Sequence, residues 1–342
     1  MTNVLQRKSN MELLRIVAMM LVLIIHSDFF TLGIPTQELC KISPGFAFGK
    51  YFFQSISIVC VNVFILISGW FGIKPNWNSF LNFLFQCLFF SIGIYLVCII
   101  TGLSNFSLKG IAECFFLTSS YWFIKAYIGL YIFAPMINAF IENKGEKDMR
   151  NYLLAYFTFQ TIFAWLSTGA EFLIAGLNTL SFIGLYTLAR FVRLYPSKYT
   201  TLPAKMYFFL FFVIAIFSTI ITFILTDLGI GHIVGRFYTY VNPIVILASL
   251  TLMLAFTRLD FKSKFINWIA CSCFAVYLLH VNPNVIGHFS NTVIKITQEN
   301  TGIIVLLYLF VFLLSVFIIS ILIDKLRIYV WTTLNNAIER RK

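Results

Sequence analysis

The chain has 342 residues, of which 60% are apolar and 11% are charged, and its formal net charge is +12. A composition this apolar excludes an ordinary soluble domain and indicates a polytopic membrane protein. A positive charge on such a protein reflects loop topology and anionic lipid, so we expect membrane lipid as a partner and no nucleic acid. The expected fold class is an all-α bundle of membrane helices.

Ten apolar segments are candidate membrane helices when windows of about 19 residues are read along the chain. They lie at 11–30, 51–72, 79–102, 121–141, 151–168, 174–194, 206–226, 239–256, 266–284 and 302–324. We expect a single membrane domain over residues 1–342, with a short cytoplasmic tail at 325–342. Residues 105–120 are too short and too polar to span, and they predict an interfacial or re-entrant piece.

The distribution of Lys and Arg predicts the orientation of the chain. With the N-terminus in the cytoplasm, 18 of the 25 Lys and Arg residues fall on the inner side and 6 on the outer side. The outer residues are Lys41, Lys50, Lys109, Lys125, Arg236 and Lys295. This bias follows the positive-inside rule, so both termini are expected in the cytoplasm.

Arg15 and His26 lie inside the first apolar segment and are eleven residues apart. That spacing is close to three helical turns, so both side chains leave one helix face about 16 Å apart. A titratable side chain at bilayer depth is costly and indicates a functional site. His26 suits the role of a general base near neutral pH. For Arg15 an alternative stays open, in which it snorkels to the headgroups while Glu12 neutralises it.

Two further titratable residues are expected near the outer end of the bundle with His26. His280 lies near the outer end of segment 266–284, and Lys125 lies at the start of segment 121–141. Such a group could activate a hydroxyl, bind an anion or relay a proton. Alternatively, Lys125 snorkels outward and His280 hydrogen-bonds between packed helices. Candidates from the adjoining loops are Asp28, Glu113 and Arg236.

Aromatic residues gather at the start of segment 121–141. Trp122 and Tyr127, with Tyr121 and Tyr131, predict either a platform for a sugar or lipid-linked acceptor or an ordinary interfacial belt. The candidate donors to a developing oxyanion are Arg15, Lys125 and hydroxyls such as those of Ser68 and Tyr277.

The cysteines predict neither a disulfide framework nor a metal site. Six of the seven fall in or beside apolar runs, and only Cys40 lies clearly in a loop. No His-Glu-x-x-His motif is present, so we expect no bound metal.

Four phrases in chain order resemble the acyltransferase 3 family of integral membrane proteins. The stretch MELLRIVAMMLVLIIHSD at 11–28 is similar to the family's opening signature, in which ten residues separate an Arg from a His. VNVFILISG at 61–69, YWFIKAYIGLYIFAP at 121–135 and CSCFAVYLLH at 271–280 are similar to three later phrases. The resemblance covers residues 11 to about 325.

The resemblance implies a membrane domain that transfers an acyl group, usually acetyl, from a cytoplasmic thioester to an extracytoplasmic acceptor. Acetyl-CoA or another acyl-CoA would be the donor substrate, with no resident cofactor, and a cell-surface polysaccharide or lipid-linked sugar would be the acceptor. The chain would lie in a bacterial inner membrane. On that basis His26 would be the catalytic base or acyl relay, and Arg15 would contact the donor. The residues expected to contact substrate are Ser68, Trp122, Lys125, Tyr127 and His280.

One departure from the family pattern concerns the donor site. Some members carry an Arg-x-x-Arg pair at the cytoplasmic mouth of the third helix, where IKPNWNSF offers only Lys74. Arg190 and Arg193 have that spacing but stand elsewhere in the order, and we interpret them as positive-inside anchors.

Two other classes of function stay open at this point. A transporter of glycans or small anions would also bury Arg, His and Lys along its path. A non-catalytic membrane partner would use the same residues only for helix packing. Consumption of a thioester separates the acyltransferase from both.

Overall fold

The computed structural model describes residues 8–167 and 171–339, and every regular element in these residues is a helix. The all-α prediction is confirmed for this part of the chain. The chain divides into two compact units, Met1–Lys74 with Trp122–Ser263, and Pro75–Tyr121 with Lys264–Lys342. Each unit combines two separate stretches of sequence, and the single-domain organisation stays a prediction.

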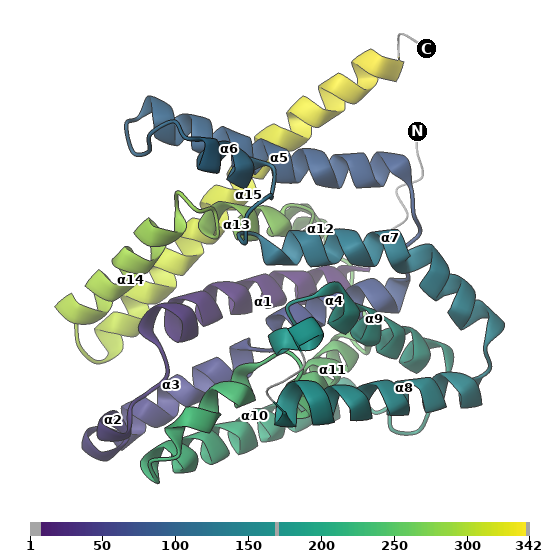
Figure 1. Ribbon diagram of the computed structural model, residues 1–342, viewed down its shortest axis with the longest axis vertical. Helices are drawn as coiled ribbons and strands as arrows, with labels where there is room; N and C mark the ends of the chain where they lie inside the picture. Colours follow the sequence, from purple (N-terminus) through teal and green to yellow (C-terminus); the bar gives the residue numbers. More distant parts are fainter. Residues whose placement is uncertain (1–7, 168–170, 340–342) are drawn as a thin grey trace. The chain divides into compact units, whose positions relative to one another are not determined.

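The first unit holds most of the helices, and Figure 1 labels its α-helices. They are α1 (Ser9–Ile25), α2 (Gln37–Ile42), α3 (Pro44–Ser57), α4 (Cys60–Phe71), α7 (Trp122–Asn143), α8 (Glu146–Gln160), α9 (Thr179–Leu194), α10 (Ala204–Asp227) and α11 (Pro243–Thr257). Two π-helical stretches, η1 (His26–Leu32) and η2 (Thr161–Leu166), continue α1 and α8. Two 3₁₀ stretches are η3 (Glu171–Gly176) and η4 (Gly231–Tyr238).

The second unit consists of α5 (Trp77–Ile100), α6 (Leu108–Cys114), α12 (Lys264–Ala270), α13 (Cys273–His280), α14 (Ile286–Glu299) and α15 (Ile303–Glu339). The segment predicted to be interfacial or re-entrant, residues 105–120, contains only the short α6, which packs on α5. Ser107 begins α6 by accepting a hydrogen bond from the backbone N–H of Gly110 at 3.0 Å. Its position in a membrane stays a prediction.

Ten membrane spans were expected, and seven helical stretches in the described residues are long and apolar enough to cross a membrane. These are Ser9–Leu32, Pro44–Phe71, Trp77–Ile100, Trp122–Asn143, Ala204–Asp227, Gly231–Thr257 and Ile303–Ala337. The other three predicted segments are also helical but interrupted or shorter, because η2 follows α8, η3 precedes α9, and a turn separates α12 from α13. Residue 168, the last of one predicted segment, lies outside the described residues. The count of ten and the orientation of the termini stay predictions.

The last helix is longer than the sequence windows predict. Residues 325–342 were expected to form a separate tail, whereas α15 continues without a break to Glu339. Asp324 and Arg327, which end the apolar run in sequence, pair with each other at 2.9 Å and are 0% and 3% exposed. Gln86 and Asn82 of α5 complete their hydrogen bonds at 2.9 Å each. Because the two charges are buried as a satisfied pair, they do not end the helix.

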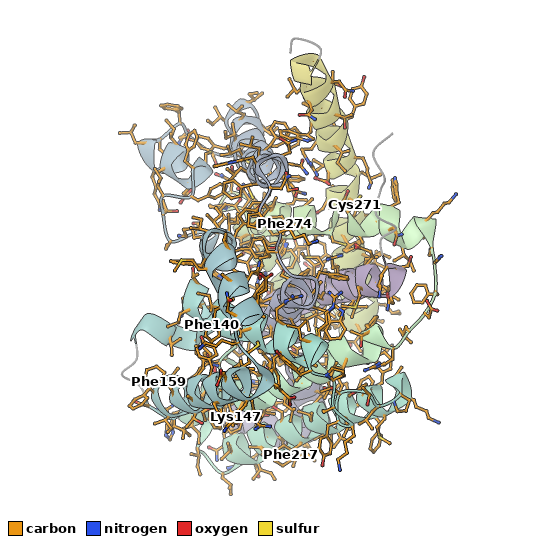
Figure 2. The ribbon with its side chains drawn as sticks, turned by 90° about the vertical axis from the view of Figure 1, so that its right-hand side faces the viewer. Phe140, Lys147, Phe159, Phe217, Cys271 and Phe274 are labelled. Atoms are coloured by element: carbon orange, nitrogen blue, oxygen red, sulfur yellow. The ribbon has the colours of Figure 1, made fainter. Side chains whose placement is uncertain are left out.

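The outer faces of the first unit carry large apolar side chains. Phe159 on α8 is 41% exposed and Phe217 on α10 is 53% exposed. Both residues are labelled in Figure 2. Exposed phenylalanines at this density suit contact with lipid acyl chains, since water would penalise them.

Close contact between α4 and α9 depends on Gly69. A Cβ added at this residue would collide with the carbonyl oxygen of Tyr186 and lie 2.9 Å from the Cβ of Ala189. Small residues allow membrane helices to approach closely, which matters because the hydrophobic effect does not drive their association in lipid. Gly69 therefore sets the separation of α4 and α9.

The substitution Gly69→Ala is expected to destabilise the first unit by about 1–3 kcal/mol, because overpacking forces the two helices apart. The measurement is the thermal unfolding midpoint of the purified protein in detergent. Gly93→Ala is the matched control, since nothing lies within 4 Å of a Cβ at that glycine in α5. A Gly69 variant as stable as the Gly93 variant would contradict the role of Gly69.

Candidate functional site

His26 lies where α1 changes from an α-helix to a π-helix. The α-helix ends at Ile25, and η1 runs from His26 to Leu32. The imidazole is half-buried and packs edge-on against Phe30, with ring centroids 5.3 Å apart. The carbonyl oxygen of His26 accepts a hydrogen bond from Thr31 Oγ1 at 2.7 Å. Hydropathy windows predict a regular helix here, and π-helical turns occur preferentially at functional sites.

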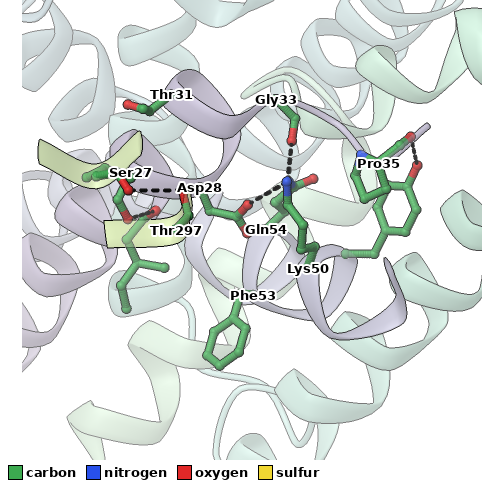
Figure 3. A network of polar contacts seen from close by, with 12 residues as sticks. Ser27, Asp28, Thr31, Gly33, Pro35, Lys50, Phe53, Gln54 and Thr297 are labelled. Carbon is green, nitrogen blue, oxygen red and sulfur yellow. Dashed lines mark hydrogen bonds and ion pairs between the residues drawn. The ribbon is translucent and has the colours of Figure 1, made fainter. Parts of the chain in front are cut away.

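A polar network on α3 holds the π-helix in place (Figure 3). Lys50 Nζ lies 3.5 Å from Asp28 Oδ1, and Gln54 Nε2 donates to the same oxygen at 3.3 Å. Lys50 and Gln54 also donate to the carbonyl oxygen of Gly33, at 3.1 and 3.2 Å. Gly33, with a φ of +74°, ends the π-helix. The network therefore holds η1 at two points: at Asp28, which is two residues after His26, and at Gly33, where the π-helix ends.

Lys50 and Gln54 are site residues that the sequence did not indicate. Lys50 was counted only as an outer charge, and Gln54 was not considered. The available signal is their i,i+4 spacing on an otherwise apolar helix, which puts both side chains on one face. Nothing in that spacing identifies Asp28 or Gly33 as their partners.

Arg15 forms the ion pair with Glu12 that its spacing allows. The Arg15 side chain is 30% exposed and that of Glu12 is 6% exposed. Its guanidinium carbon lies 5.8 Å from the ring centroid of Phe71, at the end of α4. Arg15 is therefore held against α4 as well as neutralised by Glu12.

Ser68 and Tyr127, predicted separately as substrate contacts, lie together in the first unit. Their hydroxyl oxygens, from α4 and α7, are 3.4 Å apart. Ser68 also donates to the carbonyl oxygen of Phe64 at 3.0 Å. Two helices, α4 and α7, thus contribute to one polar pair made of Ser68 and Tyr127.

Trp122 and Lys125 lie on the first turn of α7 but in different surroundings. The Trp122 ring is half-buried, with centroids 6.2 Å from Phe182 and 6.0 Å from Tyr240. The Lys125 side chain is exposed. Trp122 therefore packs among aromatic rings, while Lys125 faces outward from the helix.

His280 belongs to the second unit and is fully buried on α13. Its Nδ1 is 2.5 Å from the carbonyl oxygen of Val276, and its ring centroid is 5.4 Å from that of Phe289. The hydrogen bond stays within α13, and only the ring contact reaches another helix, α14, so the hydrogen bond between helices that the sequence left open is not the one observed. The grouping of His280 with His26 stays a prediction.

Several apolar helices of membrane length define this chain as a multi-pass membrane protein. The sequence model of the Acyltransferase domain family, Acyl_transf_3, matches residues 8–325, nearly the whole chain. The chain belongs to this family, and the resemblance seen in the four phrases is confirmed. No curated protein and no solved structure matches the chain.

Removal of the lysine from the network on α3 is expected to destabilise the protein. In Lys50→Met the half-buried Asp28 keeps only the Gln54 bond, so we expect a loss of about 1–3 kcal/mol. Lys50→Arg keeps the charge and is expected to lose less. The readout is thermal unfolding in detergent.

The matched control is Lys295→Met, because Lys295 also pairs with a carboxylate, Glu299, at 3.9 Å. That pair is 71% and 62% exposed, unlike the pair of Lys50 and Asp28, whose side chains are 13% and 14% exposed. Its loss is expected to change stability by less than about 0.5 kcal/mol. Equal effects of Lys50→Met and Lys295→Met would show that the buried network does not hold η1.

Proposed function

We propose that the protein transfers an acetyl group from cytoplasmic acetyl-CoA to a hydroxyl of an extracytoplasmic or lipid-linked glycan. The observation that carries this proposal is the family match over residues 8–325, together with Arg15 and His26 on one apolar helix. Related acyl-CoA donors would serve the same chemistry. The site for this reaction lies in a bacterial inner membrane.

The reaction needs a base and a donor to the oxyanion. In the proposed step, neutral His26 takes the proton of the acceptor hydroxyl as its oxygen attacks the thioester carbonyl carbon. A hydrogen-bond donor beside His26 stabilises the oxyanion, whereas Arg15, about three turns away along the helix, contacts the donor substrate. The carbon–sulfur bond then breaks, the coenzyme A thiolate takes the proton from the imidazolium, and the acceptor leaves as an ester.

The spacing along α1 suits a long donor. Arg15 and His26 are about three turns apart, so an extended acyl-CoA that contacts Arg15 would present its thioester near His26. The network of Asp28, Lys50 and Gln54 supports this step by holding η1. Lys125, exposed on α7, and Trp122 would contact the acceptor.

The proposed orientation places α2 outside the cell, and Cys40 is a poor reporter of it. The thiol is 2% exposed on α2, and burial raises its pKa, so little reactive thiolate forms. Glu38→Cys on the same helix, in a Cys40→Ala background, is expected to react with a membrane-impermeant maleimide on intact cells. Lys147→Cys, at an exposed residue in the first turn of α8, is expected to react only after permeabilisation. The reverse pattern would invert the orientation.

His26→Ala is expected to lower acetyl transfer by about 10²–10⁴-fold, the usual contribution of a general base. Binding of acetyl-CoA should persist, because the variant removes the base and not the donor contact. The measurements are transfer from radiolabelled acetyl-CoA by purified protein in nanodiscs, donor affinity and thermal stability.

His288→Ala is the control, because His288 is exposed on α14 and lies outside the proposed site. Full activity of His26→Ala would exclude the mechanism. Mass spectrometry of surface glycans gives the cellular test. If cells without the gene have surface glycans that are lighter by the mass of one acetyl group, the result supports acetyl transfer. If those cells lack the whole glycan, the result would indicate transport.

A further inference from the structure

Three arginines gather at the C-terminal end of α4, and we call them the arginine cluster: Arg15, Arg190 and Arg193. The guanidinium carbons of Arg15 and Arg193 each lie 5.8 Å from the centroid of the Phe71 ring. Arg190 lies against Gly72, because a Cβ added there would be 3.2 Å from its Nη1. The cluster therefore surrounds the last turn of α4.

Helix packing brings the cluster together from distant parts of the sequence. α4 packs against both α1 and α9, and on α9 the i,i+3 spacing puts Arg190 and Arg193 on one face. Gly72, with a φ of +78°, ends α4 and leaves room for Arg190. A role as positive-inside anchors, which the sequence suggests for Arg190 and Arg193, does not explain why both side chains contact the end of α4.

Helix capping accounts for one member of the cluster. Arg193 Nη1 donates a hydrogen bond to the carbonyl oxygen of Trp70, one of the free carbonyls in the last turn of α4. Its guanidinium carbon is also 5.7 Å from the centroid of the Trp70 ring. These contacts give Arg193 a structural role, but they do not include Arg190.

Charge balance is incomplete at Arg190 and Arg193. Their positive charges lie close enough to repel each other. Among residues 8–167 and 171–339, no carboxylate lies within 4.0 Å of either one, and the carboxylate of Glu12 pairs with Arg15. The Nε of Arg190 is buried and has no hydrogen-bond partner in these residues. Arg190 is half-buried and Arg193 is exposed. Positive charges gathered partly out of water without a counter-charge are costly, so this arrangement suits an anionic ligand.

The nearby polar side chains do not supply that counter-charge. The Tyr186 hydroxyl accepts from the backbone N–H of Ile73 at 2.9 Å and donates to Asn138 Oδ1 at 2.7 Å. Asn138 in turn donates to the carbonyl oxygen of Ile73 at 2.9 Å. This network fixes the turn after α4 and is neutral, so it positions the cluster without neutralising it.

We infer that the arginine cluster is a binding site for a phosphate-bearing ligand, with Arg190 as its central contact. The planar guanidinium holds phosphate through two parallel hydrogen bonds, and Arg193 and Arg15 add charge beside it. The positive-inside prediction places this end of α4 in the cytoplasm, where the donor enters. The identification of the ligand with the diphosphate of acyl-CoA rests on the proposed function. An anionic lipid headgroup offers the same chemistry, so the experiment separates the two sources.

The test measures binding of coenzyme A to purified full-length protein in phosphatidylcholine nanodiscs, with inorganic pyrophosphate as the competitor. Arg190→Gln is expected to weaken coenzyme A binding by about 10- to 100-fold, as expected for loss of charge-assisted hydrogen bonds. Arg190→Lys keeps the charge but loses the planar fork, so it is expected to give an intermediate loss. Thermal unfolding of each variant reports the integrity of the fold.

The matched control is Arg258→Gln. Arg258 is an exposed arginine that also donates to a backbone carbonyl, that of Thr200, but it lies outside the cluster. It is expected to bind coenzyme A like the unmodified protein.

The outcomes separate the site from the proposed function. Arg190→Gln could keep its affinity for coenzyme A but no longer gain thermal stability when phosphatidylglycerol is added to the nanodisc. That result would assign the site to a lipid headgroup. Unchanged affinity for coenzyme A and pyrophosphate and an unchanged response to phosphatidylglycerol would overturn the inference, even if acetyl transfer is observed. A third outcome is that Arg190→Gln loses pyrophosphate binding while the unmodified protein transfers no acetyl group. That result would support the phosphate site and overturn the proposed function.

Discussion

The close packing of α4 against its neighbours is the constraint on which the first unit depends. α4 contacts α1, α9 and α11, and Gly69 lets α9 approach until the Tyr186 backbone lies against it. The buried Asn62 of α4 also donates to the carbonyl oxygen of Tyr240 at 3.0 Å. In lipid these contacts and hydrogen bonds supply the association energy that apolar burial supplies in water. The positions of Ser68 and of the arginine cluster follow from this packing.

The treatment of buried charge distinguishes structural residues from candidate binding residues. Asp324 and Arg327 form a pair whose hydrogen bonds are satisfied within the second unit. Asp28 has Lys50 and Gln54, and Arg15 has Glu12. Each of these groups has an opposite charge that offsets the cost of removing it from water. The half-buried Arg190 differs because the described residues provide it with no carboxylate, as they provide none to the exposed Arg193 beside it, and that difference is what indicates a ligand.

The first unit thus contains two polar regions joined by α1. One is the π-helix that begins at His26 and is held by α3; the other is the end of α4 with Arg15 beside it. The regular part of α1, Ser9–Ile25, fixes the separation of Arg15 and His26 because a helix rises uniformly. A rigid spacing of this kind suits a long ligand bound at one end and reacting at the other. The π-helical turn at His26 and the closely packed Gly69 of α4 are both local departures from a regular helix or regular helix packing, as functional positions often show.

The amino-acid sequence alone determined the class of the protein, its helical segments and the family to which it belongs. These depend on hydropathy, periodicity and short phrases such as 11–28, which are local properties of the chain. It also identified the pairing of Arg15 with Glu12, because residues three apart on a helix are neighbours. It did not indicate the π-helix at His26, since no residue pattern marks that change.

Only the tertiary structure decided which distant residues meet. Asp28 meets Lys50 across two helices, Ser68 meets Tyr127 from α7, and Arg190 reaches the end of α4 from more than a hundred residues away. Each of these contacts depends on how helices approach and rotate against one another, and hydropathy does not specify either. Helix packing also brings together the two sequence stretches of each unit. It buries Asp324 with its partners, so that α15 continues past this charge. Long-range packing, and not local propensity, determined them.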